Sequence, residues 1–229
     1  MTESRGTLAP VWNESGWLDF YETHRATTAH LYPSEWFFLK DILAEDLSVL
    51  DIGCATGGLV SVLSEHLRRF TYTGVDISEN MIRRAREKHP DHRFHVIEEA
   101  DLSVLADDVY DLVTCLGVLH LSRKWRELIA AAWHRASECL LMDLRETSGA
   151  TIEDEHESHY RVGHLLQTGS TATLPYNVIN TGEALAAVME LCPGAVGLQH
   201  YGYLAPPSEA AVTTVKSVLM NTYRIDKRS

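Results

Sequence analysis

Length, composition and charge already exclude several classes of protein. The chain has 229 residues, 45% of them hydrophobic, and so suits a single domain with a substantial core and an N-terminal extension. Its formal net charge of -12 argues against nucleic-acid partners, which require clustered Lys and Arg. No run of about eighteen apolar residues occurs, and the first residues lack the order of a signal peptide. We therefore expect a soluble, cytoplasmic protein without membrane contact.

The four cysteines are Cys54, Cys115, Cys139 and Cys192. They stand far apart with no C-x-x-C pair, and three of them fall in or beside expected strands. This pattern predicts reduced cysteines in the core rather than a disulfide framework or a metal site.

The N-terminal stretch from residue 11 to residue 40 is strongly aromatic. Its aromatic residues include Trp12, Trp17, Phe20, Tyr21, Tyr32, Trp36 and Phe37. It lies outside the alternating pattern of strands and helices that follows. We therefore assign residues 1–44 to a helical cap over the ligand site.

An apolar strand at residues 49–52 runs into a loop of small residues and restarts as an amphipathic helix, with apolar positions from Leu59 to Phe70. The small residues of the loop allow the backbone to approach a ligand, and the helix N-terminus directs free N–H groups at it. Asp51, at the end of the strand, is expected to face that ligand. A ligand-free strand-to-helix turn is the alternative. The glycine spacing does not match the G-x-G-x-x-G pattern of a dehydrogenase.

A second strand at residues 72–76 ends in Asp76, about 25 positions after the loop begins. A carboxylate in this place can bind both hydroxyls of a ribose. Ser78 is then a plausible N-cap of a helix that directs Met81 inward and stops before Pro90.

Together these residues resemble the class I S-adenosylmethionine-dependent methyltransferases, whose first motif is D-x-G-x-G-x-G followed by an acidic end to the second strand. The motif here is Asp51-x-Gly53-x-Ala55-x-Gly57, with Ala55 in place of the middle glycine. The resemblance extends over about residues 45 to 225. It implies a Rossmann-like α/β fold, with a seven-stranded mostly parallel sheet, helices on both faces and an antiparallel last strand. It also implies S-adenosylmethionine as cofactor and S-adenosylhomocysteine as product.

Later elements continue this pattern. Strands are expected at residues 93–97, 109–116 and 138–143, with a helix around Trp125 to Trp133 and a turn at residues 134–138. A further helix at residues 181–191 precedes two segments, 196–203 and 215–223, that suit the antiparallel pair closing the family's sheet. The segment at about 146–180 lies outside this scheme, and we expect it to bind the acceptor.

The resemblance also implies which residues contact the cofactor. An acidic residue after the third strand binds the adenine in this family, and Asp101 with Leu102 matches that position. Tyr21 and Arg25, one helical turn apart, could reach the methionine carboxylate, or could simply belong to a helix that caps the sheet. The expected cofactor-binding residues are Tyr21, Arg25, Asp51, Gly53, Cys54, Ala55, Thr56, Gly57, Asp76, Ile77, Met81, Asp101, Leu102, Leu116 and Gly117.

Two histidines are candidates for catalysis. His120 follows the fourth strand, where it could take a proton from an acceptor or could only pack behind the cofactor. His159 belongs to a cluster with His156 and His164 in the expected acceptor segment, and one of these three could face the substrate. The cluster lacks the H-E-x-x-H order and a cysteine partner, so we predict no metal site.

The sequence therefore predicts a methyltransferase that acts on an oxygen or nitrogen of a small-molecule acceptor, as a monomer or homodimer. Three alternatives remain at this point: methylation at carbon, a protein or RNA methyltransferase, and a partner subunit that binds cofactor without catalysis. Methyl transfer from a sulfonium depends mainly on positioning, so residue types alone do not identify the acceptor.

Overall fold

The computed structural model describes residues 7–14 and 16–228. The first six residues, on which the expected absence of a signal peptide depends, lie outside the described part. Within that part, no helix has the length and hydropathy needed to cross a bilayer. All four cysteines are described, and each is free and buried.

A central sheet in the order β3-β2-β1-β4-β5-β11-β9 organises the molecule. Its strands are β1 (Leu47–Ile52), β2 (Phe70–Asp76), β3 (Arg93–Val96), β4 (Tyr110–Cys115), β5 (Ala136–Thr147), β9 (Gly197–Ala205) and β11 (Val218–Asp226), and the short β8 (Ile179–Asn180) pairs with the end of β5. The first five are parallel, whereas β11 runs antiparallel to both β5 and β9. The predicted fold class is confirmed.

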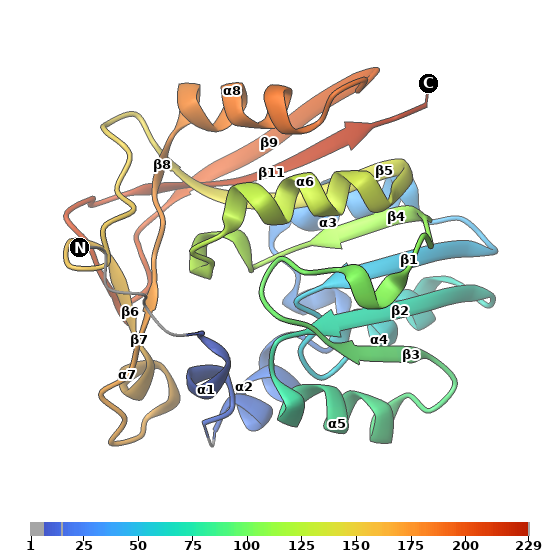
Figure 1. Ribbon diagram of the computed structural model, residues 1–229. Coiled ribbons are helices and arrows are strands. Elements are labelled where there is room, and N and C mark those ends of the chain that lie inside the picture. The colour runs from blue at the N-terminus through green and yellow to red at the C-terminus, as the bar shows by residue number, and fades with distance from the viewer. Residues whose placement is uncertain (1–6, 15, 229) are drawn as a thin grey trace.

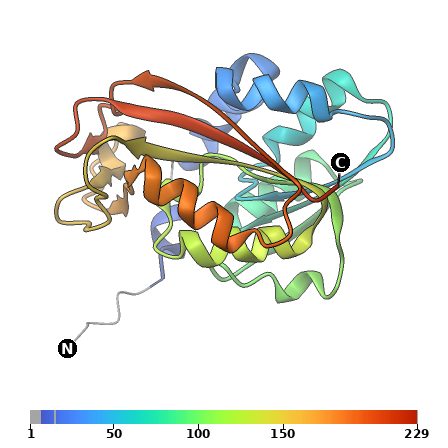
Figure 2. The same cartoon turned by 90° about the horizontal axis from the view of Figure 1, so that it is seen from above.

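Helices cover both faces of the sheet (Figure 2). They do so because successive side chains of each strand point to opposite faces, and apolar side chains occur on both. Leu50 and Ile52 belong to the apolar cluster under α6 (Trp125–Arg135) and α8 (Thr181–Leu191). Val49 belongs to the cluster on the opposite face, with α3 (Pro33–Ile42), α4 (Gly58–His66) and α5 (Glu79–Lys88). This burial on both sides is the usual environment of a parallel sheet.

Several element boundaries differ from those predicted. The helix α4 ends at His66, because Leu67 turns to extended backbone, and Phe70 opens β2 instead of closing the helix. The strand β5 is longer than residues 138–143, because β11 pairs with it as far as Glu146 and β8 extends that pairing to Thr147. The predicted turn at residues 134–138 is absent, since α6 leads directly into β5.

The remaining elements gather beyond the carboxyl ends of the parallel strands (Figure 1). They are α1 (Ala9–Trp12), α2 (Trp17–His24), α7 (Val162–Leu166) and a small antiparallel sheet of β6 (His159–Arg161), β7 (Thr173–Pro175) and β10 (Ala211–Val212). Three short 3-10 helices complete the described chain: η1 (Thr28–His30), η2 (Ser103–Leu105) and η3 (Leu119–Leu121). The N-terminal segment and the segment after β5 thus meet at the end of the sheet where ligands bind in this topology.

Candidate active site

A cavity of about 440 Å³ lies at the carboxyl ends of β1, β2 and β4. This position spans the point between β1 and β4 where the strand order reverses, at which open α/β sheets bind their ligands. Residues of α1, α2 and α7 complete its walls. The volume is in the range of small-molecule sites.

Asp76, at the end of β2, lines one end of the cavity with its carboxylate fixed in place. One oxygen accepts the backbone N–H of Ala55 at 3.0 Å, and the other accepts that of Ser78 at 2.8 Å. Burial raises the pKa of Asp76, while these N–H groups act in the opposite direction. Ser78 also caps α5 by accepting the N–H of Met81, as its sequence position predicts.

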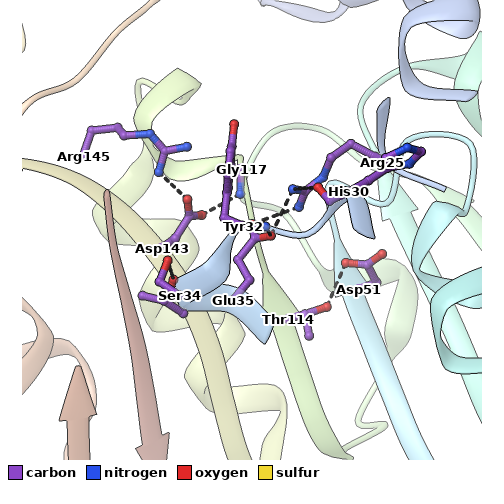
Figure 3. Close-up of polar contacts among 11 residues, drawn as sticks. Arg25, His30, Tyr32, Ser34, Glu35, Asp51, Thr114, Gly117, Asp143 and Arg145 are labelled. Atoms are coloured by element: carbon purple, nitrogen blue, oxygen red, sulfur yellow. Dashed lines mark hydrogen bonds and ion pairs between the residues drawn. The ribbon is translucent and has the colours of Figure 1, made fainter. Parts of the chain in front are cut away.

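Asp51, at the end of β1, also lines the cavity. Its two oxygens accept hydrogen bonds from the Tyr72 hydroxyl at 2.6 Å and the Thr114 hydroxyl at 2.8 Å. Figure 3 shows the bond from Thr114. Burial raises the pKa of this carboxyl to about 6, because the two hydroxyls only partly replace lost water. The negative charge of Asp51 is therefore costly in the folded chain, even though the charge of Arg25 lowers this pKa.

The loop after β1 has a backbone that requires small residues. Gly53 has a φ of 76°, and a Cβ there would lie 2.2 Å from a methyl group of Val118. Ala55 also has a positive φ, of 46°, which is unusual for a residue with a side chain. Its methyl group packs in the cluster that contains Trp17 and Met81, so the departure from the family's middle glycine is accommodated.

Gly58, in the first turn of α4, allows the N-terminal segment to dock. A Cβ at this position would lie 1.9 Å from the carbonyl oxygen of Arg25. The side chain of Arg25 lines the cavity and makes a bidentate ion pair with Glu35, at 2.9 and 3.0 Å. Glu35 itself is fully buried behind the wall.

The far end of the cavity contains His120 and Arg145, from η3 and β5. His120 is buried, and its Nδ1 has no hydrogen-bond partner. Burial, reinforced by the charge of Arg145, lowers the pKa of His120 well below its usual value, so this imidazole is neutral at pH 7. Arg145 pairs with Asp143, which also accepts the backbone N–H of Gly117 (Figure 3).

The cavity wall includes most of the residues predicted to bind the cofactor. These are Tyr21, Arg25, Asp51, Gly53, Cys54, Ala55, Thr56, Asp76, Ile77, Met81, Leu116 and Gly117. Gly57 lies outside the wall and is the N-cap residue of α4, with a φ of 78°.

Asp101, the acidic residue predicted to bind adenine, does not line the cavity. Asp101 is exposed and its carboxylate accepts the backbone N–H of Ser103, while Leu102 is buried in the core beside α6. Ile97 and Glu99 line the cavity instead. The cause is a tight bend after β3, where Glu99 has a φ of 46° and Glu98 bridges to Asp101.

Comparison with known proteins agrees with this geometry. Residues 50–138 match the family model described as a methyltransferase domain. A ubiquinone biosynthesis O-methyltransferase of Hydrogenovibrio crunogenus is 30% identical over 115 residues, which are 47% of this chain and 43% of that protein. A trans-aconitate 2-methyltransferase of Rhodopseudomonas palustris is 31% identical over 83 residues, or 36% of this chain and 30% of that protein.

Solved structures share the fold. The magnesium protoporphyrin IX methyltransferase of Synechocystis PCC 6803, solved with bound S-adenosylmethionine, superposes with a TM-score of 0.61 and 15% identity over 100% of both chains. An N-methyltransferase of Haemonchus contortus superposes with a TM-score of 0.65 and 12% identity, over 97% of this chain and 59% of that one.

Residues 50–138 therefore match a methyltransferase domain, and the chain has the fold of S-adenosylmethionine-dependent methyltransferases. The matched region runs from within β1 to the start of β5. The chain spans less than half the length of the two curated relatives named above.

The histidine cluster after β5 does not converge on the cavity. The Nδ1 of His159 lies 2.9 Å from the carbonyl oxygen of Glu155, and His156 is exposed. His159 and His164 are both absent from the cavity wall. The neighbouring Tyr160 lines it, because adjacent residues of a strand face opposite sides and Tyr160 packs inward against Tyr176.

Sequence reasoning also missed the residues that support the far end of the cavity. Arg145 and Asp143 alternate on β5 with one residue between them, a spacing that places both on the same face of the strand. Tyr32 and Glu35 are the N-cap and N3 residues of α3. The sequence did not reveal this helix start, because a tyrosine stands where the capping-box pattern S/T-x-x-E has serine or threonine. The spacing of Asp143 and Arg145 on one face of β5 was the one feature of the sequence that could have indicated these residues.

Proposed function

We propose that this chain transfers a methyl group from S-adenosylmethionine to an oxygen or nitrogen of a small-molecule acceptor. One observation carries the proposal: a single cavity connects Asp51 and Asp76 with His120 and Arg145. Asp51 and Asp76 stand where the family binds its cofactor. His120 and Arg145 lie beyond that position and are available to a second molecule, the acceptor. When bound, the cofactor supplies a methyl group on a positively charged sulfur.

The residues at the Asp76 end fit this cofactor. The carboxylate of Asp76 is held by two N–H groups and can accept hydrogen bonds from ribose hydroxyls, while Ile77 and Met81 offer apolar surface beside it. Asp51 carries a costly buried charge that a cationic group of the cofactor would offset. Tyr21 and Arg25 remain our candidates for its carboxylate. Arg25 stands between the two ends of the cavity, since its charge acts on Asp51 and its guanidinium shares the Tyr32 ring with Arg145.

The chain's contribution to the reaction is mainly positioning. The N-terminal segment and the segment after β5 line the cavity with Trp12, Trp17 and Tyr160, and we assign them to a cap and an acceptor-binding insertion that exclude water. His120 is the group placed to hold or take a proton. A neutral imidazole with a low pKa is a weak base, so an acceptor that needs little deprotonation suits this site best.

Calorimetric titration with S-adenosylmethionine, S-adenosylhomocysteine and NAD tests the proposal. We expect micromolar binding of both sulfur ligands and none of NAD. Screening of small acceptors for S-adenosylhomocysteine release then separates an enzyme from a non-catalytic subunit. Absence of binding by either sulfur ligand would contradict the proposed cofactor site.

A further inference from the structure

The β5 end of the cavity has cations on its wall and their counterions behind it. Arg25 and Arg145 line the cavity, whereas their partners Glu35 and Asp143 do not. Both carboxylates are buried, with exposed fractions of 0% and 2%. A ligand at this end therefore meets guanidinium groups first.

Arg145 retains unused hydrogen-bonding capacity. Its side chain is 4% exposed, and within residues 7–14 and 16–228 its hydrogen bond is to Asp143 through Nη1. A guanidinium has five N–H donors, so several remain for a ligand. The centre of the Tyr32 ring lies 5.4 Å from the guanidinium carbon of Arg145 and 5.3 Å from that of Arg25, within the range of cation–π attraction (Figure 3).

His120 is a second, independent indication of a ligand here. Its Nδ1 is buried and unpartnered although the side chain lines the cavity. Buried polar atoms almost always have a partner, and the ligand can supply it. Its ring lies 5.8 Å from that of Tyr176, edge to face, so packing holds the imidazole in place.

The position of Arg145 along the sheet separates it from the proposed cofactor residues. Asp76 and Asp51 end β2 and β1, whereas Arg145 lies near the end of β5, on the other side of β4. If the cofactor occupies the β1 and β2 end, Arg145 faces the acceptor. This step rests on the proposed function.

We propose that the acceptor is an organic acid whose carboxylate is bound by Arg145. A guanidinium binds a carboxylate through parallel N–H donors. A phosphate monoester fits less well, because its second negative charge would need a second cation, and Arg25, the other arginine of this wall, is our candidate for the carboxylate of the cofactor. His120 donates to or accepts from a second polar group of the same acid.

The test measures binding of simple probes by calorimetry and ligand-observed NMR, with and without S-adenosylhomocysteine. The probes are benzoate, phenylacetate, hexanoate and succinate, each with its primary amide, and phenyl phosphate. We expect the best acid to bind at least about tenfold more tightly than its amide, as a charge-assisted hydrogen bond predicts.

A double variant removes the charge without leaving a buried ion. Arg145→Gln with Asp143→Asn should lose the preference for acids while S-adenosylhomocysteine binding stays within about twofold of the native value. The matched control is Arg69→Gln with Asp46→Asn, an exposed pair outside the cavity, which should keep the preference. If the double variant does not fold, Arg145→Lys retains the charge but not the planar fork, and should bind acids at least about threefold more weakly.

Three outcomes overturn the proposal: no acid binds at about 10 mM, acid and amide bind equally, or the double variant keeps the preference. Stronger binding of phenyl phosphate than of every acid would show that the class of anion is wrong. Failure of S-adenosylhomocysteine to bind counts against the proposed function instead. The comparison of acids with amides on the ligand-free protein still decides this inference.

Discussion

The two ends of the cavity hold their charged groups by different means. At the β1 and β2 end, backbone groups hold the charge, since the N–H groups of Ala55 and Ser78 donate hydrogen bonds to Asp76. At the β5 end, side chains hold one another, as Arg25 pairs with Glu35 and Arg145 with Asp143. The first arrangement depends on loop geometry, and the second depends on buried side chains of opposite charge that pair with each other.

This difference predicts what a substitution at each end of the cavity would impair, ligand binding or folding. A carboxylate held by backbone N–H groups can be removed without stranding another charge, so its loss should affect binding more than folding. Removing one member of a buried ion pair leaves the other without compensation, and folding itself suffers. Five substitutions test that distinction.

Asp143→Ala should have the largest effect. It leaves Arg145 buried without its partner and removes the acceptor of the Gly117 N–H, so we expect the free energy of unfolding to fall by about 3–5 kcal/mol. Urea unfolding followed by circular dichroism measures it. Asp108→Ala, in the exposed pair with Arg93, is the control and should show no measurable change. An equal free energy of unfolding for the two variants would contradict our inference that the β5 end depends on a buried ion pair for folding.

Asp76→Ala should weaken binding of S-adenosylhomocysteine by about 2 kcal/mol while the protein stays folded, because the ribose hydroxyls lose their acceptor. Calorimetry gives the dissociation constant. Asp101→Ala is the matched control, since this exposed carboxylate lies outside the cavity and its removal should leave affinity unchanged. Unchanged affinity in Asp76→Ala would refute the assignment of the ribose.

His120→Ala separates a proton acceptor from a residue that only binds. If His120 takes a proton, turnover should fall by at least about tenfold while S-adenosylhomocysteine affinity stays within about twofold. Steady-state kinetics and calorimetry on the same preparation decide between the two roles. Equal losses of turnover and affinity would make His120 a binding residue.

Asp51→Asn should stabilise the ligand-free protein at alkaline pH. Burial raises the pKa of Asp51 to about 6, so the folded carboxyl holds its proton more tightly than the unfolded one, and stability is lost as pH rises from about 4 through 6. We expect the variant to gain about 1–3 kcal/mol at about pH 8 and less at about pH 5. Urea unfolding at both pH values measures this difference.

Asp111→Asn provides the opposite sign as a control. The pKa of Asp111 is lowered, because its hydrogen bonds to Ser48 outweigh burial, so its ionised form stabilises the fold above the unfolded pKa. This variant should lose stability at alkaline pH. The same sign in Asp51→Asn and Asp111→Asn would contradict a strained charge at Asp51.

His159→Ala should have the smallest effect. Its side chain lies outside the cavity and contacts the carbonyl of Glu155, so turnover and cofactor affinity should change by less than about 0.5 kcal/mol. Tyr160→Phe, one residue along, removes a hydroxyl from the insertion and should weaken acceptor binding instead. A larger kinetic effect of His159→Ala would restore that histidine as a candidate.

The sequence predicted the local structure around Asp76 because its signals are local. The glycine loop, Asp76 and the Ser78 cap lie within one strand-helix-strand unit, and the spacing of a few residues determines their geometry. The parallel part of the sheet followed from alternating strands and helices, and its antiparallel closure from the family resemblance. The bend after β3 brings Glu99 to the cavity wall and leaves Asp101 outside it, which the spacing alone did not indicate.

The β5 end could not be predicted in the same way. Glu35 and Arg25 meet only when α3 packs behind the cavity, and Tyr32 reaches both arginines across three segments. The choice between His159 and Tyr160 depends on which face of β6 turns inward, and the three residues of β6 are too few to show a pattern. Contacts between residues far apart in the sequence, such as that of Tyr32 with Arg145, produce no periodic pattern in a single sequence.

Gly58 shows that a glycine in a ligand loop can be required by the chain itself. The carbonyl oxygen of Arg25 occupies the space that any side chain at position 58 would need. A larger residue there would force the backbone around Arg25 outward, and its guanidinium would withdraw from the cavity wall with it. The absence of a side chain at residue 58 thus determines how closely the backbone of the N-terminal segment can approach α4, and with it where the side chain of Arg25 starts.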